Sequence, residues 1–216
     1  MQGVVYDNVP TKATTVQIIP ETFTKDWTTF SQMFQNCSAL TSVPALDTSN
    51  GTSFNSMFSS CYNLTSVPAL NTSNGTSFTS MFGNCYALTS IPALDTSNGT
   101  NFNAMFAACY ALTSIPALDT SNGTNFNYMF NGCTNLTTIE GIDFSGATSS
   151  IPSNIFQNCS ALTSVKVNGT IAKNIDFSGA KNLDAASCIS IAQALVVNTG
   201  MLTITFNSTT YNNILL

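Results

Sequence analysis

Three consecutive segments of the chain are near copies of one another: TSFNSMFSSCYNLTSVPALNTSNG from Thr52, TSFTSMFGNCYALTSIPALDTSNG from Thr76 and TNFNAMFAACYALTSIPALDTSNG from Thr100. A degenerate copy begins at Thr28, another begins at Thr124, and a looser unit runs from about Thr148 to Asn168. A fixed period of 24 residues indicates stacked units, each of which buries its apolar side only against its neighbours. The chain is therefore predicted to form a solenoid.

Each unit shows the apolar pattern of a short helix followed by a short strand. The apolar residues of one unit are spaced at i, i+3, i+4, i+7 and i+10, which is the helical period; they are Phe54, Met57, Phe58, Cys61 and Leu64. The next segment, LTSVPAL, is marked by Pro68 and is short, so it predicts a brief extended strand. Asn74-Gly75 predicts a closing turn. Stacking aligns such strands in parallel, and the predicted fold is an α/β solenoid whose 24-residue units each hold a short helix, a short parallel strand and an Asn-Gly turn.

Both ends of the chain depart from the repeat, as expected for caps that cover the open ends of a solenoid. Residues 1–27 are predicted to form an N-terminal cap, with apolar stretches at 4–6 and 16–19 and the single Trp27. Residues 28–168 hold the repeats. Residues 169–216 are predicted to form a final degenerate coil and a C-terminal cap, in which Asp184 begins a helix that carries Cys188, Ile191, Ala192 and Leu195. A strand-like MLTITF and a final YNNILL follow that helix.

The repeat unit MF..C..LTS(V/I)PALDTSN resembles the BspA-like class of leucine-rich repeats. The resemblance covers roughly residues 28–168 and rests on five consecutive Met-Phe-x-x-Cys-x-x-Leu matches from Met33 to Leu136. It implies a leucine-rich-repeat array whose Phe, Cys and Leu side chains face the core. It also implies a role in adhesion, on bacterial or protist surfaces or in bacteriophage virions. The ending, with Tyr211 and Leu215, is similar to the closing segment of some phage-encoded members.

The charge of the chain restricts its partners. Five Lys, no Arg and no His stand against ten acidic residues, which gives a net charge of −5. Nucleic acid is not expected as a partner, because phosphates are neutralised by clustered Lys or Arg, and anionic membranes are excluded for the same reason. No run of apolar residues reaches the length of a membrane span, so no membrane insertion is expected. The amino terminus lacks a basic stretch followed by an apolar core, which favours a virion over a signal-dependent cell surface.

The cysteines are predicted to be structural. Six of the seven occupy one repeat position on the apolar side of the unit, namely Cys37, Cys61, Cys85, Cys109, Cys133 and Cys159. There is no C-x-x-C pair and no His, so a zinc site has no support. Parallel side-chain directions and burial argue against disulfides between coils. A reduced ladder of buried thiols is therefore expected, with no metal and no cofactor.

Catalysis is not expected, because without His most general bases that act at neutral pH are missing. A remote alternative is glycan hydrolysis by Asp95 and Asp119, which adjacent coils would hold about 5 Å apart. Both belong to a column of Asp47, Asn71, Asp95, Asp119 and Asp143. The column either binds a hard cation such as calcium or caps the turns of the DTSNG segments, and the caps are favoured because Asp and Asn both serve there.

The candidate binding residues follow the cysteines. The position after Cys is filled by Ser38, Tyr62, Tyr86, Tyr110, Thr134 and Ser160, so three consecutive coils carry Tyr. Tyr62, Tyr86 and Tyr110 are predicted to form the central contact patch for a cell-surface glycan or protein, because tyrosine offers an apolar face with a polar tip. The alternative is that these rings only shield the seam between helices. At the level of the whole protein, the alternative to recognition is a structural virion part, a decoration or fibre component that binds other virion proteins.

Overall fold

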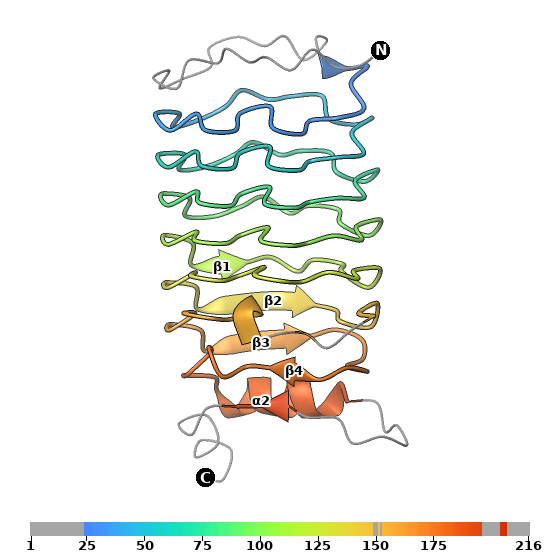
Figure 1. Ribbon diagram of the computed structural model, residues 1–216, viewed down its shortest axis with the longest axis vertical. Helices are drawn as coiled ribbons and strands as arrows, with labels where there is room; N and C mark the ends of the chain where they lie inside the picture. Colours follow the sequence, from blue (N-terminus) through green and yellow to red (C-terminus); the bar gives the residue numbers. More distant parts are fainter. Residues whose placement is uncertain (1–23, 149–150, 152, 196–203, 207–216) are drawn as a thin grey trace.

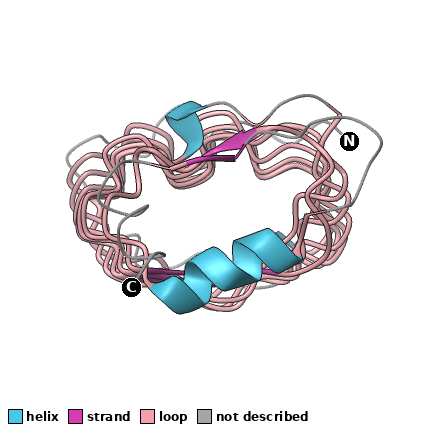
Figure 2. Cartoon of the chain, turned by 90° about the horizontal axis from the view of Figure 1, so that it is seen from below, coloured by secondary structure: helices cyan, strands magenta, loops and turns pink. Residues whose placement is uncertain are grey.

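The chain folds into a stack of similar coils (Figure 1). The computed structural model describes residues 24–148, 151, 153–195 and 204–206. Seen along the stack, the coils superimpose as an oval ring (Figure 2). Parallel backbone bridges join residues 24 positions apart, linking Thr29, Ser53, Ser77, Asn101 and Asn125 in one series. The predicted solenoid is confirmed. The division at residues 27 and 168 stays a prediction, and residues 1–23, 196–203 and 207–216 of the predicted caps lie outside the described residues.

The predicted parallel strands are present towards the C-terminal end of the stack. β1 (Ser114–Ile115), β2 (Thr138–Ile142) and β3 (Ser164–Val167) form one parallel sheet in that order. β4 (Ile175–Asp176) pairs in parallel with β5 (Ile204–Thr205), which lies within the predicted MLTITF strand. The longest strands, β2 and β3, lack the proline that the LTSVPAL segment of earlier coils carries. Because proline has no N–H to donate, those earlier segments stay extended without a continuous ladder of hydrogen bonds.

The predicted short helix at the start of each unit is wrong. In residues 31–36, 55–60, 79–84, 103–108 and 127–132 the backbone forms consecutive turns instead. Alternate N–H groups donate to carbonyls of the next coil at 2.8–3.0 Å, from Phe54, Ser56, Phe58 and Ser60 to Ser77, Thr79, Met81 and Gly83. The intervening N–H groups of Met57, Ser59 and Cys61 donate to the carbonyl three residues earlier at 3.1–3.2 Å. Seven of the eight backbone N–H groups from residue 54 to residue 61, all but that of Asn55, are thereby used, and four of the seven bond between coils.

Positive φ angles explain why a helix is not formed. Ser56 has φ 53° and Ser60 has φ 63°, and the equivalent positions of the other coils up to residue 132 show the same left-handed conformation; in the following coil only Asn158 does. A right-handed helix needs negative φ at every residue. The turns nevertheless bury the residues that the helical pattern selected, because a turn every three or four residues has nearly the same side-chain spacing. Phe54, Met57 and Phe58 are all fully buried.

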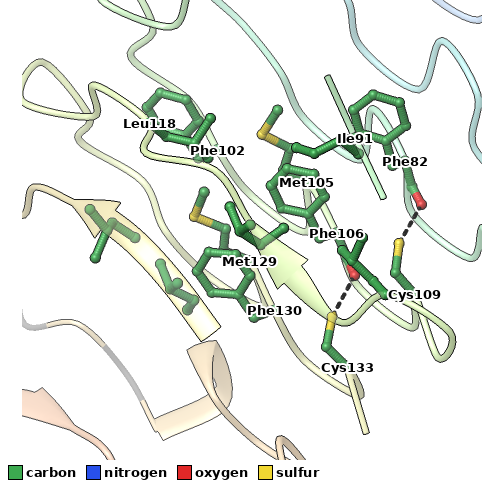
Figure 3. Packing of buried hydrophobic residues seen from close by; sticks show 14 of the residues in the cluster. Phe82, Ile91, Phe102, Met105, Phe106, Cys109, Leu118, Met129, Phe130 and Cys133 are labelled. Atoms are coloured by element: carbon green, nitrogen blue, oxygen red, sulfur yellow. Dashed lines mark hydrogen bonds between the residues drawn. The ribbon is translucent and has the colours of Figure 1, made fainter. Parts of the chain in front are cut away.

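The core is built from columns of identical side chains (Figure 3). Phe58 stacks on Phe82 with ring centroids 5.6 Å apart, and Phe82 stacks on Phe106 at 5.7 Å. The thiol of Cys109 donates to the carbonyl oxygen of Phe82 at 3.1 Å, and that of Cys133 to the carbonyl of Phe106 at 3.0 Å. All seven cysteines are reduced and buried, so the predicted thiol ladder is confirmed. Five of the thiols also link two coils by a hydrogen bond, which the sequence pattern did not indicate: those of Cys61, Cys85, Cys109, Cys133 and Cys159.

Two short helices lie near the C-terminal end: η1 (Ser153–Ile155) and α2 (Ala185–Gln193). Asp184 caps α2 as predicted, its carboxylate accepting from Ser187 N–H at 2.7 Å. In the end view α2 runs along one long side of the oval (Figure 2), and it packs against β3. The hydroxyl of Ser187 accepts the Val165 N–H at 2.9 Å, which satisfies a donor at the open edge of β3. This helix therefore closes the sheet that a further repeat would have continued.

Candidate ligand-binding face

Three tyrosines form an exposed stack on the outside of the coils. Tyr62 and Tyr86 have ring centroids 4.7 Å apart and an interplanar angle of 11°, and Tyr86 and Tyr110 are 4.8 Å apart at 23°. Their exposed fractions are 40%, 38% and 43%, in a chain whose large apolar residues are mostly buried. The structure thus brings together the three residues that the sequence selected as a contact patch. We call them the tyrosine ladder.

The backbone holds each ring at the same place on successive coils. Each tyrosine follows a fully buried cysteine and precedes a fully buried leucine by two residues, as Tyr86 lies between Cys85 and Leu88. The carbonyl of Tyr62 accepts from Ala87 N–H at 3.1 Å, and the carbonyl of Tyr86 accepts from Ala111 N–H at 3.1 Å. Two buried anchors and one bond to the next coil therefore fix the root of each side chain and leave its ring at the surface.

The stack changes what the ladder offers to a ligand. Tyr86 has an aromatic neighbour on both faces, so only its edge and hydroxyl reach the solvent. Burial of this group, followed by the phenols of Tyr110 and Tyr62, raises the pKa of Tyr86 above its usual value. The hydroxyl of Tyr86 therefore stays neutral and can both donate and accept hydrogen bonds. The flat faces open to a partner lie at the ends of the ladder, on Tyr62 and Tyr110.

One end of the ladder borders a hollow of about 600 Å³, which we call the Tyr110 hollow. Besides Tyr110, its lining includes Asn131, Gly132, Gln157, Ser160 and Lys181. The sequence pattern selected none of these residues except Tyr110. The available signal was the loss of tyrosine in the next two coils, where Thr134 and Ser160 take its place. Lys181 lies after the repeats and had no signal in the period.

The Asp/Asn column caps turns, as the sequence favoured. Oδ1 of Asp95 accepts from Ser97 N–H at 3.1 Å and from Ser97 Oγ at 2.7 Å, and Asn71 binds Ser73 in the same way. Hydrogen bonds from the Ser97 side chain and backbone hold the pKa of Asp95 below its usual range. Within the described residues no group of three or more His, Cys, Asp or Glu side chains is arranged to hold a metal ion.

The carboxylate pair considered for glycan hydrolysis lines a second hollow of about 710 Å³ with Asp143, which we call the Asp groove. Asp119 accepts hydrogen bonds from Ser121 just as Asp95 accepts them from Ser97, so the two carboxylates make matching hydrogen bonds. Retaining hydrolysis needs one carboxylic acid with a raised pKa beside an ionised nucleophile. The lowered pKa of Asp95 is the opposite of what the acid requires.

No helix in the described parts of the chain has the length and apolar character needed to cross a bilayer.

Comparison with known proteins places the chain in a family. The model of the family described as "Mycoplasma protein of unknown function, DUF285" matches residues 6–114 and 66–169. No curated protein matches the sequence. A crystal structure of a leucine-rich-repeat protein of T. pallidum is similar in fold, with a TM-score of 0.56 and 16% identity over 81% of this chain and 78% of that one. At that identity the likeness concerns the fold alone. The two family matches together span well over half of the sequence, and the chain therefore belongs to the DUF285 family, with a fold like that of leucine-rich repeats.

Proposed function

We propose that this protein is a non-catalytic adhesion module that recognises a glycan or protein on a cell surface through the face bearing Tyr62, Tyr86 and Tyr110. The observation that carries the proposal is the tyrosine ladder: three large aromatic rings, each about two-fifths exposed, stacked in register on consecutive coils. Aromatic residues held rigid at a surface lose little entropy on binding and contribute strongly to recognition.

The surroundings of the ladder support recognition rather than further core packing. Asn63 lies next to Tyr62, and its side-chain amide donates to the carbonyl of Ser38 at 2.9 Å. Asn135 donates in the same way to the carbonyl of Tyr110 at 2.8 Å. These amides stiffen the backbone beside the rings, which pre-organises the surface for a ligand. Solenoids commonly use such extended faces for binding.

The place of action that we propose is the outside of a cell or a virion. It rests on the resemblance of the repeats to adhesion proteins, and the phage-like ending is part of the same proposal. The competing function, a structural virion part that binds other virion proteins, is separated from adhesion by the experiment below.

The test compares binding of fluorescently labelled protein to bacterial cells and to an array of glycans. The triple variant Tyr62→Ser, Tyr86→Ser, Tyr110→Ser removes the ladder with the residue that coils carrying Ser38 and Ser160 already have there. The matched control is Tyr128→Ser, because Tyr128 is exposed at 48% and lies outside the ladder, at a position that is Ser56 and Ser80 in earlier coils. We expect at least a tenfold loss for the triple variant and none for the control.

Equal binding by the folded triple variant would reduce the ladder to packing and overturn the proposal. If the wild-type protein does not bind cells or glycans but binds virus particles that lack it, the structural virion role is favoured instead. Circular dichroism and melting temperature establish that each variant remains folded.

A further inference from the structure

The chain contains six Asn-Gly dipeptides, and the structure holds one of them differently from the other five. Asn-Gly is prone to deamidation because glycine has no Cβ beside its backbone nitrogen, so this nitrogen can attack the side-chain amide carbon of the preceding asparagine. The attack needs a backbone N–H that is not hydrogen-bonded, an asparagine side chain that can turn, and access of water. The six asparagines are Asn50, Asn74, Asn98, Asn122, Asn131 and Asn168.

In the four copies that close the repeat units, both reacting groups are already held. Gly75 N–H donates to the carbonyl of Thr72 at 2.8 Å. The side-chain amide of Asn74 donates to the carbonyl of Ser49 in the preceding coil, also at 2.8 Å. Gly75 is buried, and a Cβ atom added there would lie 2.6 Å from Cζ of Phe78. The same two hydrogen bonds recur at 2.7–2.9 Å in Asn50-Gly51, Asn98-Gly99 and Asn122-Gly123. Reaction at these sites therefore requires a local opening that breaks both bonds.

Asn131-Gly132 lies in the turns of its coil and is held in the same way. Gly132 is buried, and its N–H donates to the carbonyl of Gln157 at 2.8 Å. The side-chain amide of Asn131 donates to Gln157 Oε1 at 2.8 Å. Five of the six dipeptides thus have both the nucleophile and the amide engaged.

Asn168-Gly169, which follows β3 directly, has neither restraint. Within the part of the chain that the structure describes, the N–H of Gly169 and the side-chain amide of Asn168 make no hydrogen bond. Gly169 is exposed, so water reaches the peptide between the two residues. The backbone N–H of Asn168 donates to the carbonyl of Ile142 at 2.7 Å, which holds the chain before the dipeptide but not the groups that react.

The fold requires the glycine that makes this site reactive. Gly169 has φ 81°, in the left-handed region, and a Cβ atom added there would overlap the carboxylate of Asp143. Any other residue at position 169 would strain the backbone and displace Asp143. The packing at the end of β3 therefore explains why an Asn-Gly dipeptide occurs here outside the repeat.

We infer that Asn168 is the site at which the folded protein deamidates, while the fold protects the other five Asn-Gly dipeptides. The nitrogen of Gly169 forms a bond to Cγ of Asn168, the bond from Cγ to the side-chain nitrogen breaks, and ammonia leaves with the proton that Gly169 gives up. Water then opens the resulting succinimide at either carbonyl, which produces aspartate or isoaspartate at position 168. The inference does not depend on the adhesion proposal.

The modification changes the Asp groove. Asn168 lines this groove together with Asp95, Asp119 and Asp143. The product adds a fourth carboxylate to the lining and one negative charge to a chain of net charge −5. The modified protein should therefore separate from the unmodified protein on anion exchange.

The experiment compares the six asparagines within one sample. Wild-type protein is incubated at mildly alkaline pH, folded and, in parallel, unfolded in urea, and chymotryptic peptides are followed by mass spectrometry over time. Asn98 and Asn122 lie in identical DTSNGTNF peptides and are measured together, whereas Asn50 and Asn74 lie in distinct ones. In the folded protein we expect Asn168 to convert at least about tenfold faster than Asn50 or Asn74, because only the latter need local opening. In urea all six should convert at rates within about threefold, because unfolding removes the protection.

Two results of this comparison would overturn the inference. One is an equal rate at Asn168 and Asn50 in the folded protein. The other is a rate at Asn168 that rises about tenfold on unfolding, because it would mean that the fold protects this site as well.

Two variants assign the acidic form seen on anion exchange. Asn168→Ser removes the reactive amide, and Asn98→Ser makes the same change at a protected dipeptide and serves as the control. We expect the acidic form to accumulate at least about fivefold more slowly in folded Asn168→Ser and at the wild-type rate in Asn98→Ser, because Asn98 is protected. Accumulation at the wild-type rate in Asn168→Ser would refute the assignment. Circular dichroism verifies the fold of each variant, and the peptide comparison in the wild-type protein decides the question if a variant does not fold.

Discussion

Replacing Ala104 or Ala108 by glycine distinguishes stacked turns from a helix by the sign of the stability change. Ala104 has φ 53° and Ala108 has φ 58°. A non-glycine residue held in the left-handed region costs about 1–2 kcal/mol. Glycine removes that cost but adds about 0.5–1 kcal/mol of backbone entropy lost on folding. We therefore expect each substitution to stabilise the protein by about 0.5–1 kcal/mol.

A helix in the same segment predicts the opposite result, because glycine in a helix interior costs about 1 kcal/mol relative to alanine. The internal control is Ala107→Gly. Ala107 lies between the two positions and does not have a positive φ, so the entropy cost is not offset and destabilisation is expected. Gly132, with φ 78°, shows that glycine already occurs at the Ala108 position of another coil.

Equilibrium unfolding in urea measures the effect as a shift of the midpoint at constant slope. The reasoning requires Ala104→Gly and Ala108→Gly to move the midpoint upward and Ala107→Gly to move it downward. If all three variants lose about the same stability, the segment is helical in solution and the stacked-turn description fails.

Three further predictions follow from the ladders and caps. Asp95→Asn should leave the melting temperature unchanged with or without calcium, because Asn71 already makes the same hydrogen bonds in its own coil. Asp95→Ala removes these bonds and should lower the melting temperature by about 2–4 °C. A rise in the melting temperature of the wild-type protein on adding calcium would restore the cation-site hypothesis. All seven thiols should react after denaturation, while in the folded protein Cys109 should react slowly, since burial raises its pKa well above the usual value; fewer than seven would mean disulfides. The tyrosinate absorbance that is lost on Tyr86→Phe should have its midpoint above pH 10.0, because the pKa of Tyr86 is raised. The folding stability that the neutral Tyr86 contributes is fully present below pH 10.0 and is lost as the pH rises through the raised pKa. A midpoint at or below pH 10.0 would contradict the stacking.

The solenoid and its core were predictable because the same apolar pattern recurs in every unit of the sequence. A buried position appears several times in the sequence, so the apolar columns of Phe54, Met57 and Cys61 could be read from one alignment of the chain with itself. The spacing alone could not distinguish a helix from successive turns, since both return a side chain to the core every three or four residues. The local signal was composition: the second left-handed column holds Asn36, Ser60, Asn84, Ala108, Gly132 and Asn158. Asn and Gly are the residues that tolerate positive φ best.

The tyrosine ladder was predictable for the same reason, because three equivalent positions carry the same residue. The Tyr110 hollow was not, because it depends on side chains of several coils and on Lys181, which follows the repeats. The sequence repeat reveals the residues that all coils share, whereas the Tyr110 hollow forms where neighbouring coils carry different residues. Only the folded chain brings Gly132, Gln157 and Lys181 to the hollow that Tyr110 borders.

The regularity that stabilises this protein also limits where it can bind. In coils that are near copies, each aromatic ring of a column stacks on its own equivalent, and turn amides such as that of Asn98 donate to a backbone carbonyl of the neighbouring coil. Stacking and hydrogen bonding between coils therefore use the groups that a ligand needs. The thiol of Cys109 binds the Phe82 carbonyl, and the second face of Tyr86 meets Tyr110. Binding capacity therefore concentrates where the copying stops. Gly132 and Thr134 mark that point, since they leave the face of Tyr110 without the ring that the period would have supplied.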